Sequence, residues 1–408
     1  MRVLVYPHAM GTDSAQLDAV EIAAATMERG HDVLVASRPG PLAVVAGRLG
    51  LPLALLEGGA VRPSRHAAAE LTRLARQHRI DVVHGYEWPS ALESFAGPRL
   101  RLGLPVVCTV NSMYLAPFLP RSVPLVVGTD EGRLRAVQAG HDSVTLLEAP
   151  VDVRANAPDF DPGTFRSDLG FDAAVPLVVM VGRLASEIRL AGLFAACDAV
   201  GELASWGTPV QFAVVGDGPS RPLVARAADK ANATAGRRAV ALAGPLRDPR
   251  PAYAAADVIL GMGASALRGL AFGKPLVVQG DHGFWELLTP DTAPQLIRQA
   301  WYGLGAEGRR AGTIRLMSIL RELIEQPDTR ARLGQYSRSL VVERYSVERT
   351  AKEQEEVYAE AIARSARPSL RELAEAARTG AGLLRHHAAR AWQTWRGNGP
   401  ADELGASG

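Results

Sequence analysis

The chain has 408 residues, of which 47% are hydrophobic and 22% charged, and its formal net charge is +2. This balance excludes an intrinsically disordered chain, and the length is sufficient for two domains that each bury a core. A nearly neutral chain also lacks the strongly basic character typical of nucleic-acid-binding proteins, so we expect no nucleic-acid partner.

The first 150 residues alternate between strand-like and helix-like segments. Most of the strand-like segments are continuous apolar runs, which are typical of strands covered on both faces. Helices are predicted at 15–29, where Gly30 ends the pattern, and at 65–78. Such repeats predict a parallel sheet with right-handed crossovers. The predicted strands are Val3–Tyr6, Val33–Ala36, Leu53–Leu56, Val82–His84, Val106–Val110, Leu125–Gly128 and Val144–Leu147.

A segment rich in Pro, Asp and Gly, about Pro150–Val175, predicts a linker between a first domain (1–155) and a second (156–345). The alternation then restarts, with strands at 177–181, 211–215, 240–243, 258–260 and 276–278, and helices at 188–206, 219–233, 251–256 and 264–272. Doubly wound domains bind ligands outside the carboxyl ends of their strands. We therefore expect these ends to face each other across a cleft that holds the site.

The last part of the chain, 366–408, has a different composition. Residues Ser369–Arg396 predict an amphipathic helix with several Arg and His opposite Leu and Trp, and the final GNGPADELGASG predicts a disordered tail. The helix either lies on an anionic membrane surface or packs on its own N-terminal domain or on a second subunit. We favour packing, because Ala is frequent and the apolar stripe is modest.

Two cysteines, Cys108 and Cys197, lie in apolar runs and are expected to pack in the core. So few cysteines suit a reducing compartment. The N-terminal run MRVLVYPH is too short for a signal-peptide core or a membrane span, so it predicts a first strand. We therefore expect a cytoplasmic protein.

Two glycine turns each follow a predicted strand of the second domain and precede a helix. A glycine turn lets a ligand approach the backbone, and a helix N-terminus offers free N–H groups to a diphosphate. The alternative is an ordinary tight turn, and no G-x-G-x-x-G follows the first strand of either half. The turns are Gly216-Asp217-Gly218 and Gly261-Met262-Gly263-Ala264-Ser265.

Arg183 and Arg189 follow the predicted strand 177–181 in the run GRLASEIRLAGL. Two fixed cations beside a diphosphate would stabilise the charge that develops on a leaving phosphate. The alternative is a solvated helix start in which an arginine pairs with Glu187.

In their order and spacing, the motifs of residues 1–365 resemble glycosyltransferase family 4, the retaining enzymes of the GT-B fold. The N-terminal half has HAMGTDSAQLDAVEIA, DVVHGYEW and PVVCTVNSM, and the C-terminal half has VVMVGRL, FAVVGDGP, LAGPLRDPRPAYAAADVIL and ALRGLAFGKPLVV. The run RYSVERTAKEQEEVYAEA resembles the last helix of the family, here 346–365, which crosses back to the first domain. The resemblance implies an α/β fold of two Rossmann-like doubly wound domains, with 366–408 as a helical extension.

The resemblance also implies roles for particular residues. By motif position Arg183 and Arg189 would hold the diphosphate of a nucleotide sugar, and Asn111 stands where the family commonly has His. Leu246 or Arg247 would lie beside the nucleobase. The loop Gly11-Thr12-Asp13-Ser14 would close on the phosphate, and His84, Glu87 and Trp88 would line the acceptor side.

Several positions depart from the family pattern. The two signature glutamates are replaced by Leu260 and Arg268, so both carboxylates are missing. Arg268 could bind a ribose hydroxyl or a phosphate, but it cannot accept a hydrogen bond as a carboxylate does. The usual glycine pair of the first loop is Asp13-Ser14. Glu286, in GFWELL, is either a replacement carboxylate or an ordinary surface helix residue.

The predicted function is transfer of a sugar from a UDP-, GDP- or dTDP-sugar to a sugar, natural-product or envelope-glycan acceptor, with retention. The family chemistry relies on positioning and on leaving-group stabilisation, without an enzyme nucleophile. We expect no cofactor and no metal, as neither cleft-facing loop has a D-x-D. Frequent Ala, Arg and Gly suggest a bacterial source. The alternatives are a non-catalytic relative that binds a nucleotide or glycan or acts as a scaffold for an active partner, and a sugar-nucleotide epimerase, which would need acid–base groups at the sugar.

Overall fold

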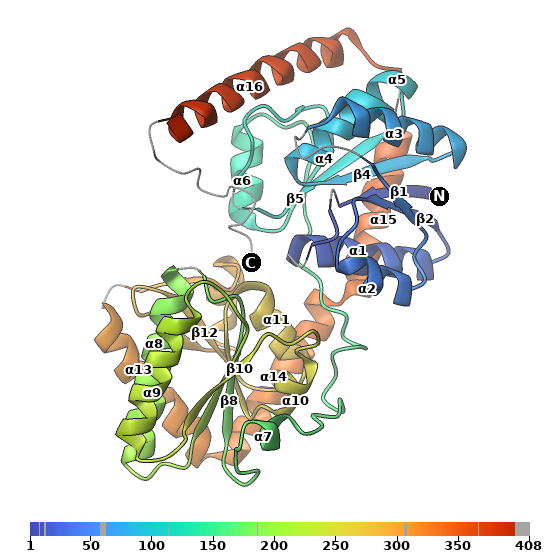
Figure 1. The fold of residues 1–408 in the computed structure, drawn as a ribbon. Helices are drawn as coiled ribbons and strands as arrows, with labels where there is room; N and C mark the ends of the chain where they lie inside the picture. The colour runs from blue at the N-terminus through green and yellow to red at the C-terminus, as the bar shows by residue number, and fades with distance from the viewer. Residues whose placement is uncertain are drawn as a thin grey trace. The chain divides into compact units, whose positions relative to one another are not determined.

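The computed structural model describes residues 1–7, 9–11, 14–57, 63–112, 114–185, 187–305, 308–365 and 367–395. The chain divides into two compact units. Unit 1 comprises Met1–Pro150 and Val347–Gly408, and unit 2 comprises Val151–Ser346. Each unit is built around one sheet with helices on both faces (Figure 1).

The sheet of unit 1 is parallel throughout and has the order β3-β2-β1-β4-β5-β6-β7. Alternate residues of β1 enter the two opposite cores: Val3 and Val5 one, Leu4 and Tyr6 the other. Both faces are therefore covered, which explains the continuous apolar runs. The strands are β1 Arg2–Tyr6, β2 Asp32–Ser37, β3 Leu53–Leu55, β4 Val82–Tyr86, β5 Val106–Val110, β6 Leu125–Val127 and β7 Val144–Leu146.

The helices of unit 1 lie on both faces of the sheet. Figure 1 shows α1 (Ser14–Glu28), α2 (Leu42–Arg48) and α15 (Val347–Ala363) on one face, and α3 (Arg65–Gln77), α4 (Glu87–Ser94) and α5 (Leu100–Leu102) on the other. A π-helical turn at Phe95–Arg99 joins α4 to α5. The remaining helices are α6 (Asp130–Gln138) and α16 (Leu370–Trp395).

The sheet of unit 2 has the order β10-β9-β8-β11-β12-β13, in which only the edge strand β13 is antiparallel. The strand order reverses beside β8, as in other doubly wound folds. The strands are β8 Leu177–Val181, β9 Gln211–Val215, β10 Val240–Gly244, β11 Val258–Gly261, β12 Leu276–Asp281 and β13 Trp285–Leu287, and the short β14, Gly303–Leu304, pairs with β12.

Helices again cover both faces of this sheet. In Figure 1, α8 (Glu187–Ser205), α9 (Arg221–Ala235) and α13 (Gly308–Glu325) lie on one face, opposite α10 (Arg250–Ala255), α11 (Gly263–Ala271) and α14 (Pro327–Tyr345). The short helices are α7 (Phe165–Asp168) and α12 (Ala293–Arg298). None of the helices in the described part of the chain has the length and apolarity needed to cross a membrane.

Residues 151–175, which the sequence predicts as a linker, pack as part of unit 2. Val151 and Phe165 are buried, and Val151 forms a bridge with Ser346. Arg166 donates to the carbonyl oxygens of Ala255 and Val175 and forms an ion pair with Asp257 at 2.6 Å. Apart from the single turn of α7, the run has no regular secondary structure, so periodicity cannot distinguish it from a free linker.

The predicted strands are all present, although some of their bounds differ. β4 continues to Tyr86 rather than ending at His84, which places His84 inside the strand. β13 and β14 were not predicted, so Glu286 lies on a strand and not on a surface helix. Cys108 and Cys197 are free and buried as expected, and burial raises the pKa of Cys197 to about 12.

Candidate active site

The carboxyl ends of β1, β4 and β5 are neighbours in the sheet of unit 1, so the segments that follow them converge at one edge. Gly11 follows β1, Glu87 follows β4 and Asn111 follows β5. Gly11 and Asn111 are half-buried. Thr12 and Asp13 lie outside the described residues, as does the side chain of Ser14, whose backbone begins α1.

Glu87 holds two of these segments together. Its backbone has φ of +64°, a conformation that costs a residue with a side chain about 1–3 kcal/mol. Its carboxylate accepts hydrogen bonds from the backbone N–H of Asn111 (2.9 Å) and of Ser112 (3.2 Å), and from the Ser112 hydroxyl (2.8 Å). Burial raises the pKa of Glu87, against the effect of these hydrogen bonds. Glu87 therefore shapes the start of the loop after β5.

His84 does not line the acceptor side as predicted, because it is fully buried. One ring nitrogen bonds the Tyr358 hydroxyl at 2.8 Å and the other the Thr109 hydroxyl at 2.7 Å. Burial lowers the pKa of His84 to about 3, so the ring is neutral at physiological pH. The prediction failed because it ended the strand at His84, whereas two further strand residues place the ring in the core.

Trp88 is also internal, with 4% of its surface exposed. Its ring packs edge-to-face against Phe118 at 5.4 Å and against His386 of α16 at 5.6 Å. Like His84 and Glu87, it supports the edge rather than presenting its side chain there. Of the predicted residues in unit 1 that the structure describes, Gly11 and Asn111 are the ones that remain partly accessible.

In unit 2, backbone hydrogen bonds join the glycine turn after β9 to the loop after β8. Gly182 N–H donates to Val215 O (2.9 Å), Leu184 N–H to Asp217 O (2.9 Å) and Ser220 N–H to Leu184 O (3.0 Å). A Cβ on Gly216 would lie 2.0 Å from Gly182 O, and one on Gly218 would lie 2.5 Å from Leu184 O. These glycines are required by the close approach of two backbone segments, so the reason for them is internal packing.

This fastening fixes the backbone of Arg183 at the carboxyl edge of the sheet. The Arg183 side chain is exposed and forms no hydrogen bond or ion pair with any residue that the structure describes. A cation held by its backbone but without a partner suits an anionic ligand. Arg189 lies in the first turn of α8, but its side chain is outside the described residues. Of the two predicted arginines, the structure therefore describes the side chain of Arg183 and not that of Arg189.

The N-terminus of α11 follows β11 at the same edge. Gly263 is buried with φ of +55°, its N–H donates to Trp301 O at 3.1 Å, and a Cβ would lie 2.5 Å from the Tyr302 hydroxyl. This amide is therefore not available to a ligand. Ala264 and Ser265, both half-buried, follow in the first turn, where helix amides lack an intrahelical acceptor. No local pattern in the sequence connects Tyr302 to α11, so its role could not be predicted.

The two positions where the family has signature glutamates, Leu260 and Arg268, differ in their surroundings. Leu260 is fully buried in β11 and belongs to the core. Arg268 lies in α11, and its buried Nη2 has no hydrogen-bond acceptor among the described residues. A buried guanidinium nitrogen without an acceptor costs free energy, so this position favours a bound group that accepts a hydrogen bond.

Glu286 is not a free replacement carboxylate. It lies on the edge strand β13, opposite Val278, and forms an ion pair with Arg315 of α13 at 2.6 Å. Leu246 and Arg247 follow β10 and are exposed at the same edge as Arg183. Among the predicted donor residues of unit 2, Arg183, Gly216, Asp217, Gly218, Leu246, Arg247 and Gly261 to Ser265 thus lie at or just after the carboxyl ends of β8, β9, β10 and β11, whereas Arg268 lies within α11 and Glu286 on β13.

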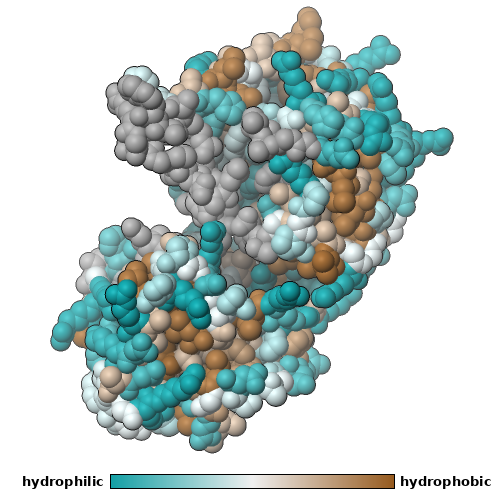
Figure 2. Space-filling model, in the orientation of Figure 1, coloured by the Kyte–Doolittle hydropathy of each residue, from teal (hydrophilic) through white to brown (hydrophobic). Residues whose placement is uncertain are grey.

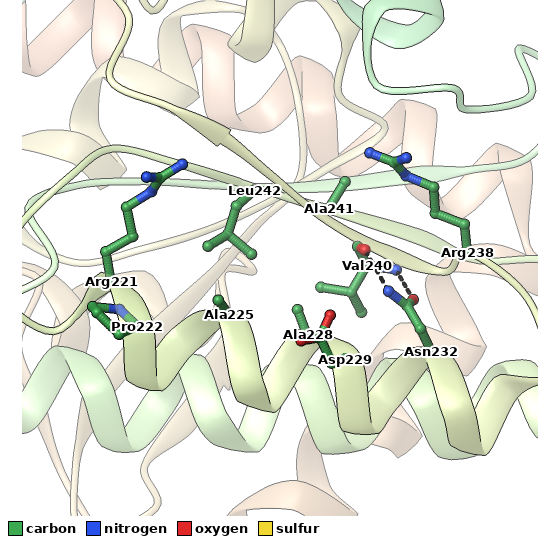
Figure 3. A pocket seen from close by; sticks show the side chains of 10 residues that line it. All are labelled: Arg221, Pro222, Ala225, Ala228, Asp229, Asn232, Arg238, Val240, Ala241 and Leu242. Carbon is green, nitrogen blue, oxygen red and sulfur yellow. Dashed lines mark hydrogen bonds between the residues drawn. The ribbon is translucent and has the colours of Figure 1, made fainter.

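A surface pocket of about 530 Å³ lies between α9 and the edge strand β10, apart from these loops. Figure 3 shows Arg221 and Arg238 at its two ends and small apolar side chains between them. Asn232 is bonded to Val240 of the strand. On the face of unit 2 seen in Figure 2, apolar residues likewise lie between hydrophilic ones. None of the predicted donor residues lines this pocket.

Two family models match the chain. Residues 18–138 match the model described as Glycosyltransferase Family 4, and residues 175–299 match the model described as Glycosyl transferases group 1. The first lies in unit 1 and the second in unit 2. No curated protein matches the sequence significantly.

Solved structures share the fold at low identity. A glycosyltransferase from Rickettsia africae has a TM-score of 0.72 and 15% identity, covering 89% of this chain and 99% of that one. Anabaena HepE, solved with UDP, has a TM-score of 0.65 and 16% identity, covering 88% and 100%. A structure described as a putative UDP-N-acetylglucosamine 2-epimerase from Listeria monocytogenes has a TM-score of 0.61 and 11% identity, covering 90% and 98%.

Proposed function

Because the chain is a glycosyltransferase of the GT-B fold and the family 4 type, we propose that it transfers a sugar from a nucleotide-sugar donor to a sugar, natural-product or envelope-glycan acceptor. In this proposal unit 2 binds the donor. The observation that carries it is the carboxyl edge of unit 2, where the loop of Arg183 is hydrogen-bonded to the glycine turn after β9 and the neighbouring strand β11 leads into α11. The Arg183 side chain forms no ion pair with the described residues. UDP, the nucleotide in the HepE complex, is the first to test.

The proposed transfer retains the anomeric configuration. The bond between the anomeric carbon and the diphosphate oxygen breaks, and the acceptor oxygen bonds to that carbon on the same face. The acceptor proton passes to an oxygen of the leaving diphosphate. Arg183 stabilises the negative charge on that group, and such electrostatic stabilisation is the main catalytic contribution to a reaction of this kind. We further propose that the reaction needs no metal and occurs in the cytoplasm, where the two buried thiols stay reduced.

Calorimetric titration with UDP, GDP and dTDP tests the donor site, and a hydrolysis assay of the matching nucleotide sugars, with and without EDTA, tests turnover. We expect one nucleotide to bind with a dissociation constant at least tenfold below the others, and its sugar conjugate to be turned over equally in EDTA. Failure of all three nucleotides to bind would contradict the proposal.

A non-catalytic relative is the second candidate, and the observation that favours it is the loss of both signature carboxylates. Leu260 is buried in the core, and Arg268 carries the opposite charge. Nucleotide binding without turnover of any nucleotide sugar would establish this alternative. No observation favours epimerisation, since His84 and Glu87 are engaged inside unit 1.

We also propose that the outer face of α16 contacts an anionic membrane surface. Leu370 and Leu384 are 86% and 72% exposed, and Leu373 and Trp392 are exposed as well. No acidic residue occurs between Ala376 and Pro400, whereas Glu372 and Glu375 face inward. A basic amphipathic helix of this kind lies at the interface of anionic lipid.

Co-sedimentation with vesicles tests this contact. We expect binding to phosphatidylglycerol vesicles, no binding to phosphatidylcholine vesicles, and loss of binding in the Leu384→Glu variant. If the protein instead stays in the supernatant as a dimer that Leu384→Glu dissociates, the outer face binds a second copy.

A further inference from the structure

The inner face of α16 is fastened to the loop that joins β5 to β6, residues 111–124. Thr379 donates its hydroxyl hydrogen to Phe118 O at 2.9 Å. Arg378 donates to Pro117 O at 3.2 Å and to Leu119 O at 2.7 Å. Three successive carbonyl groups of the loop are thus bonded by side chains of one helical turn.

Further contacts extend this attachment along the helix. Glu375 accepts hydrogen bonds from the backbone N–H and the hydroxyl of Ser122. At Gly382, a Cβ would lie 2.5 Å from the Phe118 Cβ, so only glycine lets the helix come this close. His386 packs its ring against Phe118 at 5.4 Å. The helix therefore follows the loop over three turns.

The start of the loop is held by α4, another helix of unit 1. Glu87 bonds the amides of Asn111 and Ser112, and the adjacent Trp88 contacts Phe118. The loop that begins with Asn111 is thus fixed at its start by Glu87 and between 117 and 122 by α16. A cavity of about 290 Å³, lined by Tyr114, Pro117 and Arg135 among others, lies between the loop and α6.

We propose that α16 is a clamp that positions the acceptor-side loop of unit 1, with Glu375, Arg378 and Thr379 as positioning residues. The proposal rests on the proposed function, because it takes the carboxyl edge of β4 and β5 as the acceptor side. Loops on a rigid scaffold set the selectivity of a site, and this loop depends on side chains of a helix more than 250 residues later for its shape. Loss of the contacts between α16 and the loop weakens acceptor binding and leaves donor binding in unit 2 unchanged.

The test compares the double variant Arg378→Ala/Thr379→Val with Arg385→Ala. Arg385 is a matched control, since it lies on the same helix, is exposed, and forms no hydrogen bond or ion pair with the described residues. Each full-length protein is examined in three ways. Amide hydrogen exchange of residues 114–123 reports on the loop. KM and kcat for transfer from UDP-glucose to 4-nitrophenyl glycosides report on the acceptor, and the dissociation constant of UDP and the rate of UDP-glucose hydrolysis report on the donor.

We expect exchange of the Ala116, Phe118 and Leu119 amides to accelerate at least tenfold in the double variant and KM for the nitrophenyl acceptor to rise about 5- to 30-fold. UDP binding and hydrolysis should stay within twofold, and Arg385→Ala should match the wild type. Thr379→Ser, which keeps the hydroxyl, should behave as the wild type and guards against misfolding of the double variant.

Unchanged exchange, or faster exchange with an unchanged acceptor KM, would overturn the clamp. An equal loss of UDP affinity would also overturn it, because the helix would then stabilise the whole chain. Absence of UDP binding in the wild type would instead contradict the proposed function, and the exchange measurement would still decide whether α16 holds the loop.

Discussion

At the residue scale, Arg183 is held by the backbone hydrogen bonds of its loop at the carboxyl edge of unit 2, and its side chain forms no ion pair with the described residues. We expect Arg183→Ala to lower the rate of transfer about 100- to 1,000-fold, since it removes one preorganised group from the developing charge on the diphosphate. Steady-state kinetics measures the loss, and circular dichroism checks the fold. Arg226→Ala, on an exposed face of α9, is the matched control. Equal rates in the two variants would remove Arg183 from the mechanism.

Gly216 carries a packing requirement that can be tested apart from activity. Its φ is +139°, and an added Cβ would lie 2.0 Å from Gly182 O. We expect Gly216→Ala to lower the free energy of unfolding by about 2–3 kcal/mol. Gly236→Ala is the control: φ is +66° with open space around it, so it should cost only about 1 kcal/mol. Urea denaturation compares them, and equal losses would show that the close approach is unimportant.

The positions of the site residues at strand ends could be predicted from the sequence better than the burial of their side chains. Arg183 and Gly216 lie in the loops that follow β8 and β9, and Ala264 lies in the first turn of α11, at the strand ends to which the motifs assigned them. The accessibility of His84 and Trp88 could not be predicted, because it depends on Tyr358, Thr109 and His386, which are distant in the chain. A local pattern carries no information about such partners.

At the element scale, α16 is held at its N-terminal end by a largely buried ion pair between Arg99 and Glu372 at 2.7 Å. Burial opposes the ionisation of Glu372, but the hydrogen bonds from Arg99 and Ser369 outweigh it and lower its pKa. At pH values above 4.5, the ordinary pKa of Glu, the ionised Glu372 therefore stabilises the docked helix. This contribution is lost as the pH falls through the lowered pKa.

We expect the hydrogen-exchange protection factors of residues 370–383 to fall several-fold between pH 6 and pH 3, after correction for the intrinsic exchange rate. Glu372→Gln should have lower protection at pH 6 and a weaker dependence on pH, because it lacks the titrating group. A Gln variant with the same pH dependence as the wild type would assign the effect to other groups.

At the scale of the whole molecule, the chain returns to unit 1 after completing unit 2. The helix α15 buries Val347, Ala351 and Tyr358 against unit 1, and the Tyr358 hydroxyl bonds the buried His84. We expect a chain ending at Ser346 to lose the cooperative unfolding transition of unit 1. A chain ending at Ser365 should keep it, because it retains α15. Thermal unfolding followed by circular dichroism compares the two, and a stable unit 1 without α15 would contradict this role.

The sequence by itself determined where the parallel strands lie along the chain, apart from the short β14, and the placing of the glycine turns and Arg183 at strand ends. These follow from continuous apolar runs and turn residues, whose signals are local. Only the tertiary structure decided that 150–175 packs in unit 2, that Glu286 pairs with Arg315, and that α16 fastens the loop after β5. Each of these depends on contacts between segments that are distant in sequence, and burial or pairing of a side chain is a property of such contacts.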